Sequence, residues 1–190
     1  SLLISPMEYL RKELKKFRYI GPLRKVPKRK DTQISRSQLS WSDGLAAWNM
    51  LQTQHPSINI NEVNEWILKR FKTGYCFESE RYKEVDITDL HSQKAAESQN
   101  KYEKLNLQDQ LAPFSAKTRL QIRDKNRGIY VSPADIGVGI SQMLPVIVLA
   151  LAFEQGVLSI EQPELHIHPA LQVALSDFFI EKIHSADNIN

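Results

Sequence analysis

The apolar positions recur every three or four residues in four stretches of the chain, which predicts four helices that each bury one face. The first helix runs from about residue 5 to 16, and its expected buried stripe is Met7, Leu10, Leu14 and Phe17. Two more begin at residues 42–44 and near Asn61, and the last runs from Pro169 to about His184. Their expected inward residues are Leu45, Trp48 and Leu51, then Val63, Trp66, Ile67 and Phe71, and finally Leu171, Leu175, Phe178 and Phe179.

Short strands are predicted between these helices. Residues 17–20 form an extended piece that Gly21-Pro22 stops, and residues 75–77 and 81–87 have the composition of two short strands. Residues 118–123 alternate between polar and apolar side chains, a turn follows at 124–128, and residues 129–131 return. This last pattern predicts a β-hairpin.

The last third of the chain has the pattern of an α/β layer. Residues 143–153 are almost wholly apolar, which predicts a helix buried on most of its surface, with Pro145 in its first turn and Gly156 after its end. Residues 157–160 predict a short buried strand of the kind found in parallel sheets. Because a buried helix, a buried strand and another helix follow one another, the predicted fold class is α/β.

Composition supports a folded protein and excludes several classes. Of the 190 residues, 42% are hydrophobic and 25% are charged, which is enough to bury a core. The longest apolar stretch is shorter than the roughly 18 residues that span a bilayer. No basic-then-apolar leader opens the sequence, so we expect a cytoplasmic protein with no membrane partner. A single cysteine, Cys76, excludes a disulfide framework and a cysteine-based zinc cluster.

Three regions of the chain differ in composition. Residues 1–30 predict a basic helix and loop, residues 31–116 a mainly helical and variable region, and residues 117–190 the α/β part. Within the middle region, the polar stretch 88–116 has the composition of either a surface helix or a mobile insertion.

Positive charge is concentrated at the start of the chain. The first 30 residues carry ten lysines and arginines against two glutamates, a net charge of +8, whereas the whole chain carries +3. A polyanion responds to local charge, so this segment is a candidate nucleic-acid contact, although a solvated helix face followed by a loop is the favoured interpretation. The candidate contacts are Arg11, Lys12, Lys15, Lys16, Arg24, Lys28 and Arg29.

Candidate chemistry is concentrated in the loop that follows the predicted strand 157–160. Glu161, Glu164, His166 and His168 come just past the carboxyl end of that strand, where open α/β sheets bind ligands. An acidic residue there can hold Mg²⁺ directly or through water, and a second carboxylate can orient or deprotonate an attacking water. A polar loop that caps the following helix is the alternative interpretation.

Three blocks of the sequence, in order, resemble a bacterial family of AAA/ABC-type P-loop ATPases, which are relatives of the overcoming-lysogenisation-defect and SMC-like ATPases. The block from Val157 to Pro169 is similar to the Walker B strand of that family followed by its Pro-Glu-x-His-x-His-Pro motif. The segment from Asp135 to Pro145 is similar to the family's signature segment, and the segment from Tyr19 to Arg24 resembles its Gly-Pro-Leu-Arg motif. The resemblance implies an α/β fold that forms part of an ABC-type P-loop NTPase head.

The resemblance also implies roles for individual residues. Glu161 takes the Walker B acidic position and would hold the Mg²⁺ shell. Gln162 stands where many relatives carry the catalytic glutamate. Because an amide can orient a water but cannot accept its proton, Glu164 is the candidate base. The residues implied to meet the γ-phosphate of ATP held by a partner subunit are Gly137, Gly139, Ser141 and Gln142.

The phosphate-binding loop of such ATPases is missing from the sequence. None of the seven glycines has a second glycine five residues later, so the chain has no Gly-x-x-x-x-Gly-Lys-Ser/Thr motif. We therefore expect the chain to be the second part of a split ATPase head, trimmed at both ends and inactive by itself.

The two histidines of the loop have more than one interpretation. Together with Glu164, His166 and His168 offer three ligands to zinc or iron, but the other three histidines lie in no supporting pattern. We expect the imidazoles instead to cap the helix that begins at Pro169, or to contact nucleotide across a dimer interface.

Two functions remain open at this point. The first is the C-terminal portion of an ATP-hydrolysing head that binds Mg²⁺ and ATP and forms a homodimer around the nucleotide. The family implies a link to DNA transactions or phage defence, in some members beside a partner nuclease. The second is a non-enzymatic nucleic-acid-binding module that uses residues 11–30 and keeps a degenerate ATPase remnant.

Overall fold

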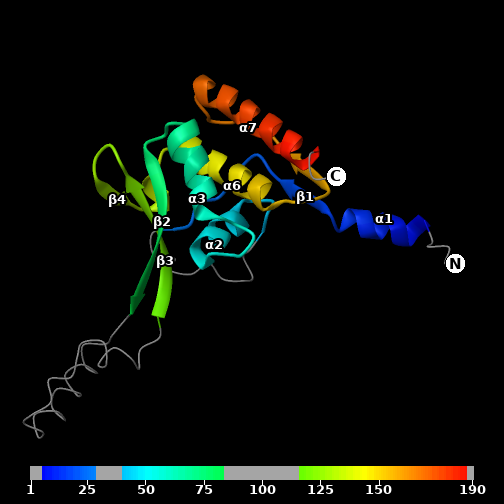
Figure 1. Ribbon diagram of the computed structural model, residues 1–190, viewed down its shortest axis with the longest axis horizontal. Helices are drawn as coiled ribbons and strands as arrows, with labels where there is room; N and C mark the ends of the chain where they lie inside the picture. The colour runs from blue at the N-terminus through cyan, green and yellow to red at the C-terminus, as the bar shows by residue number, and fades with distance from the viewer. Residues whose placement is uncertain (1–5, 29–39, 84–115, 188–190) are drawn as a thin grey trace, which may run out of the picture.

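A computed structural model describes residues 6–28, 40–83 and 116–187 (Figure 1). Helices and two small sheets alternate along the chain, so the mixed α/β class predicted from the sequence is confirmed. Arg29 and nearly all of the polar stretch 88–116 lie outside the described residues. None of the described helices combines the length and the apolar character that a bilayer crossing requires.

The first sheet joins two segments that lie about 140 residues apart in the sequence. Strand β1 (Phe17–Ile20) runs parallel to β5 (Val157–Ile160), with Phe17 beside Val157 and Ile20 beside Ile160. Both strands have the predicted bounds. The expectation that β5 is buried is wrong, because Val157 is 61% exposed and the other three residues are only partly covered. Among the described residues β5 pairs with β1 alone, so no described strand pairs with its other edge.

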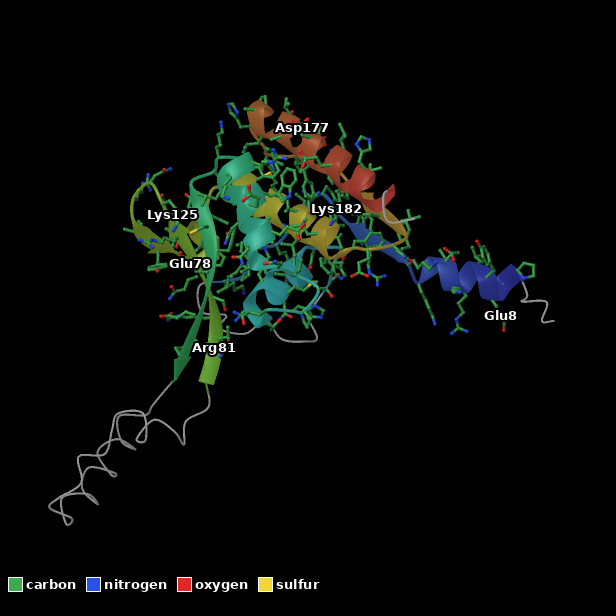
Figure 2. The ribbon with its side chains drawn as sticks, in the orientation of Figure 1. Glu8, Glu78, Arg81, Lys125, Asp177 and Lys182 are labelled. Atoms are coloured by element: carbon green, nitrogen blue, oxygen red, sulfur yellow. The ribbon has the colours of Figure 1, made fainter. Side chains whose placement is uncertain are left out.

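The second sheet is an antiparallel meander of β2 (Tyr75–Lys83), β3 (Ala116–Asp124) and β4 (Ile129–Val131). The predicted hairpin is confirmed, and the buried Asp124 carboxylate closes its turn by accepting the backbone N–H groups of Asn126 and Arg127. Residues 75–83 form one strand rather than two short ones. Their polar middle fits a strand because Glu80 bonds Arg119 across the ladder, while Glu78 lies beside Lys125 at 3.6 Å (Figure 2).

Helix α6 (Val138–Ala152) forms the centre of the hydrophobic core. Eleven consecutive residues, 141–151, are buried. The helix begins five residues earlier than its apolar run predicts, so Pro145 lies inside it and not in its first turn. The proline ring packs against Gly44, where an added Cβ would lie 3.0 Å from the Cβ of Pro145.

The other helices pack around α6. Helix α2 (Leu45–Thr53) buries Trp48 and Leu51, and helix α3 (Ile60–Asn64) continues into the π-helix η2 (Glu65–Arg70), burying Val63 and Ile67. Helix α7 (Pro169–Asp187) covers the outside of this layer (Figure 1). The ring of Phe178 on α7 meets the edge of the Trp66 ring at a centroid distance of 4.7 Å. These inward residues agree with the sequence prediction.

Helix α1 (Pro6–Leu14) has the predicted apolar stripe, but the stripe faces solvent. Met7 is 72%, Leu10 53% and Leu14 61% exposed, and no residue of α1 is buried by the described part of the chain. Figure 1 shows the reason, because α1 extends away from the body and no other described element lies over it. The periodicity therefore predicted the helix correctly and its burial wrongly.

Two truncations test this difference between α1 and α7. Leu175→Ala removes a side chain that is 3% exposed in the core, so we expect a loss of about 2–5 kcal/mol in the free energy of unfolding. Leu10→Ala removes an exposed side chain and should change that free energy by less than about 0.5 kcal/mol. Urea denaturation of both variants checks this, and an equal loss in both would show that α1 is covered in solution.

Candidate functional site

The carboxyl ends of β1 and β5 bring two of the sequence blocks to one edge of the sheet. Ile20 and Ile160 are paired, and the Glu161 N–H donates to the Ile20 carbonyl at 3.0 Å, so the two following loops leave side by side. The Gly21 N–H donates to the Ser42 carbonyl at 2.8 Å, which turns the first loop across the edge. Glu161 therefore follows a parallel strand directly, as predicted.

The carboxylate of Glu161 is exposed and is held by one neighbour. The hydroxyl of Tyr19, on β1, donates to Glu161 Oε1 at 3.0 Å. This hydrogen bond raises the pKa of the Tyr19 phenol above its ordinary value, and the carboxylate charge acts in the same direction. Sequence reasoning missed Tyr19 as a site residue. The available signal was its position on β1 next to Ile20, beside the end of the strand that carries Glu161.

Arg24 joins the two loops to α6. Arg24 is 3% exposed. Its guanidinium donates through Nη2 to the Glu161 carbonyl at 2.7 Å and through Nη1 to the Gln142 carbonyl at 3.2 Å. Burial lowers the pKa of Arg24, while the negative charge of Glu164 acts in the opposite direction. The assignment of Arg24 to a nucleic-acid surface is therefore incompatible with the structure, because a buried guanidinium that binds backbone carbonyls has no free donors at the surface.

Gln142 completes this arrangement from the side of α6. Its side chain is 8% exposed; Oε1 accepts the Arg24 N–H at 3.0 Å, and Nε2 donates to the Arg24 carbonyl at 2.7 Å. This pairing uses both groups of the amide. Gln142 is thus turned inward, away from the partner-subunit nucleotide that the resemblance implied for it.

The other signature residues divide between the surface and the interior. Gly137 precedes α6 and is exposed, and no side chain caps that helix end. Gly139 lies against the loop of β5, since an added Cβ would be 2.8 Å from the His166 carbonyl oxygen. Ser141 is 4% exposed and its hydroxyl donates to the Val138 carbonyl at 2.9 Å, so it is not presented to solvent.

The loop between β5 and α7 is tightly turned. Gln162 and His166 both have positive φ angles, +42° and +63°, which non-glycine residues rarely adopt. The side chains of Gln162, Glu164 and His166 are exposed. His168 caps α7, because its Nδ1 accepts the Ala170 N–H at 3.3 Å, so the capping interpretation holds for this histidine.

The structure gives a defined answer on metal ligands. Within residues 6–28, 40–83 and 116–187, no three histidine, cysteine, aspartate or glutamate side chains lie close enough to hold a metal ion together. The histidine-glutamate set considered for zinc or iron is therefore not assembled. A hydrated Mg²⁺ needs fewer protein ligands, because the ion keeps several of its waters.

The remaining basic candidates lie on or near α1. Arg11, Lys12 and Lys15 are exposed, and Lys16 pairs with Glu13 at 3.1 Å. Lys28 is exposed at the end of the first described segment. Arg11 and Lys12 belong to α1, the helix that extends from the body and carries Glu8 in Figure 2.

Cys76 is the one thiol of the chain and is buried on β2. Burial raises its pKa, and its thiol donates to Glu78 Oε1 at 3.5 Å, which favours the protonated form further. A thiol that is held protonated is a poor nucleophile, so Cys76 offers no second reactive centre.

Comparison with known proteins adds no relative. No family model matches the chain, and neither a curated protein nor a solved structure matches it. The class supported at this point is a mixed α/β protein with a polar site at the carboxyl edge of a parallel strand pair.

The Tyr19–Glu161 pair can be tested by titration. We expect the Tyr19 phenol to titrate above its ordinary pKa, Glu161→Gln to lower that pKa, and Glu161→Ala to lower it more, because only the alanine removes the acceptor. The raised pKa contributes stability that is complete below the ordinary tyrosine pKa and is lost as the pH rises through the folded value. NMR of ¹³Cζ-labelled tyrosine checks this, and Tyr19→Phe identifies the signal; no response to Glu161→Ala would contradict the pairing.

The contact of Gly139 with the loop can be tested with a matched pair of variants. Gly139→Ala places a Cβ against the His166 carbonyl, so we expect a loss of about 1–3 kcal/mol in the free energy of unfolding. Gly137→Ala adds the same group where nothing lies within 4 Å and should stay within about 0.5 kcal/mol of the parent. Equal denaturation midpoints for the two variants would show that α6 does not approach the loop.

Proposed function

We propose that this chain is part of an ATP-binding and ATP-hydrolysing head of the ABC type, with Glu161 at its magnesium site. One observation carries the proposal: the three sequence blocks that resemble such ATPases meet at one point. Arg24 of the first block bonds Gln142 of the second and Glu161 of the third, across separations of 118 and 137 residues. A chance resemblance in three short segments gives no reason for them to converge.

The chemistry of the edge fits a hydrated divalent cation. Glu161 supplies a carboxylate oxygen that is open to solvent, and hard oxygen ligands are those that Mg²⁺ prefers. Its position past the end of a parallel strand is where ligands of α/β sheets bind. Glu161 would hold the ion, which would supply Lewis-acid chemistry at the phosphate oxygens of ATP. Gln162 would orient a water, and Glu164 would accept its proton.

Only part of the signature segment, residues 135–145, is accessible to a nucleotide that a second subunit would hold. Ser141 and Gln142 are turned inward, which leaves the exposed Gly137 and the uncapped start of α6 as the groups of the signature segment at the surface. Backbone N–H groups at a helix start favour phosphate. A homodimer closed around Mg-ATP would use this end of α6, and the phosphate-binding loop would be supplied by a segment outside these 190 residues.

The exposed basic face of α1 supports a second candidate function, nucleic-acid binding. Arg11 and Lys12 are exposed on α1, and Lys15 is exposed just after its end. Because α1 extends away from the body, a polyanion has access to these side chains (Figure 1). This function is compatible with an ATPase linked to DNA, and it also stands alone as the non-enzymatic alternative.

Charge-neutralising variants of the full-length protein test the ATPase. We expect Glu161→Gln to lower kcat by about 100-fold or more through loss of the ion, and Glu164→Gln to lower it by a similar factor through loss of the base. Glu154→Gln is the matched control, because Glu154 is exposed before the opposite end of β5. Turnover that is unaffected by both substitutions, or a protein that does not bind Mg-ATP, would overturn the proposal.

Salt dependence tests the nucleic-acid candidate. If Arg11, Lys12 and Lys15 each contact a phosphate, the logarithm of the DNA association constant should fall with the logarithm of salt concentration. A triple Ala variant at these positions should reduce that slope by about 2.7. A control triple variant at Lys69, Arg127 and Lys182, on other elements, should leave the slope unchanged. DNA binding that does not respond to salt would exclude this function.

A further inference from the structure

Arg24 is an unusual side chain to find inside this protein, because it has no ion-pair partner among the described residues and its Nε has no hydrogen-bond partner there. Burying a charge is costly unless hydrogen bonds compensate for it. Here the compensation comes from two backbone carbonyls, Gln142 in α6 and Glu161 after β5, with the charge of Glu164 nearby. An apolar side chain would fill this space without the free-energy cost of burying a charge. Packing alone therefore does not explain why an arginine is found here.

The geometry of the guanidinium indicates its role. Its planar group fixes the directions of the Nη1 and Nη2 donors relative to each other, and a lysine ammonium cannot reproduce that arrangement. Consequently the Gln142 and Glu161 carbonyls are held at fixed positions on the same rigid group. The Gln142 amide also bonds both backbone groups of Arg24, so that this part of α6 and the Arg24 segment move as one unit.

One of the two carbonyls that Arg24 binds belongs to Glu161, whose carboxylate is the proposed magnesium ligand. The peptide that follows it leads into Gln162, whose positive φ is a backbone state that persists only where the surroundings impose it. The Glu161 N–H is fixed to the Ile20 carbonyl and its own carbonyl to Arg24. Because the N–H and the carbonyl of Glu161 are both held, the orientation of its backbone is fixed, and that orientation sets the direction of its side chain. The bond to the carbonyl comes from Arg24.

We propose that Arg24 is a positioning residue that sets the direction of the Glu161 carboxylate and couples it mechanically to the first turns of α6. A displacement at the exposed start of α6, such as the docking of a second subunit, would reach Glu161 through Gln142 and Arg24. The link to ATP turnover rests on the proposed function. The effect of Arg24 on the direction of the Glu161 carboxylate does not depend on ATP and can be tested without it.

Tyr19 reports the direction of the Glu161 carboxylate because its hydroxyl donates to Oε1. The variant is Arg24→Lys, and the matched control is Arg18→Lys, since Arg18 also donates to backbone carbonyls but lies near the surface. We expect Arg24→Lys to shift the ¹³Cζ NMR signal of Tyr19 at neutral pH, and Arg18→Lys to leave it unchanged. In a Glu161→Ala background, Arg24→Lys should cause no further shift.

A second tyrosine–glutamate pair separates positioning from general loosening of the fold. Tyr130 donates to Glu78 at 3.2 Å on the second sheet, so its signal should not respond to Arg24→Lys. Gln142→Met removes the bonds to the Arg24 backbone and should shift Tyr19 in the same direction as Arg24→Lys. A stability loss with an unchanged Tyr19 signal, or equal shifts at Tyr19 and Tyr130, would overturn the positioning role.

Kinetics of the full-length protein complete the test. We expect Arg24→Lys to lower kcat at least tenfold with little change in KM, and Arg18→Lys to change neither. If the wild-type protein hydrolyses no ATP, the proposed function fails while the Tyr19 signals still decide the role of Arg24. If the wild type hydrolyses ATP and Arg24→Lys changes neither kcat nor the Tyr19 signal, the positioning role fails and the proposed function stands.

Discussion

The arrangement of this protein around its candidate site depends on one buried guanidinium. Arg24 bonds the carbonyls of Gln142 and Glu161, and its own backbone is paired with the Gln142 amide. These bonds tie together the start of α6 and the loops after β1 and β5. Because every acceptor is a backbone or amide oxygen, the interaction specifies where segments lie and adds little net attraction between opposite charges. The polar site is therefore built on a fixed frame, which the chemistry that we propose for it would require.

The parallel strands β1 and β5 also hold the candidate site in place, and these strands are incompletely covered by the described part of the chain. Val157 on β5 and Phe17 on β1 are substantially exposed, and so is the apolar stripe of α1. Apolar residues in these places are unusual for a surface that faces water permanently. The edge of β5 with which no described strand pairs is consistent with the proposal that the phosphate-binding part of the head comes from a segment outside these 190 residues.

The sequence predicted local structure well and long-range contacts poorly. The bounds of β1 and β5, the hairpin and the inward faces of α2, α3 and α7 follow from periodicity, since each depends on neighbouring residues. Burial of α1 and β5 could not be predicted, because it depends on which other elements cover them. Glu161 lies at a strand end, as predicted. The resemblance assigned Ser141 and Gln142 to a surface that meets nucleotide, and the local positive charge assigned Arg24 to a nucleic-acid surface, but all three residues are buried. The inward directions of Gln142 and Arg24 arise from hydrogen bonds between residues more than 100 positions apart, which no local pattern encodes.

Pro145 has a consequence for the motion of α6. A proline donates no backbone hydrogen bond, so the carbonyl four residues before it, that of Ser141, lacks its helical donor in the middle of an otherwise buried helix. The missing bond separates the turns that carry Gly139 and Gln142 from the rest of α6. Local opening is favoured where the hydrogen-bond ladder is interrupted, so we expect the amide hydrogens of the first turn to exchange with solvent sooner than those after the proline. The first turn of α6, whose Gly139 lies against the loop after β5, is thus the part that can open while the buried turns after Pro145 keep their packing.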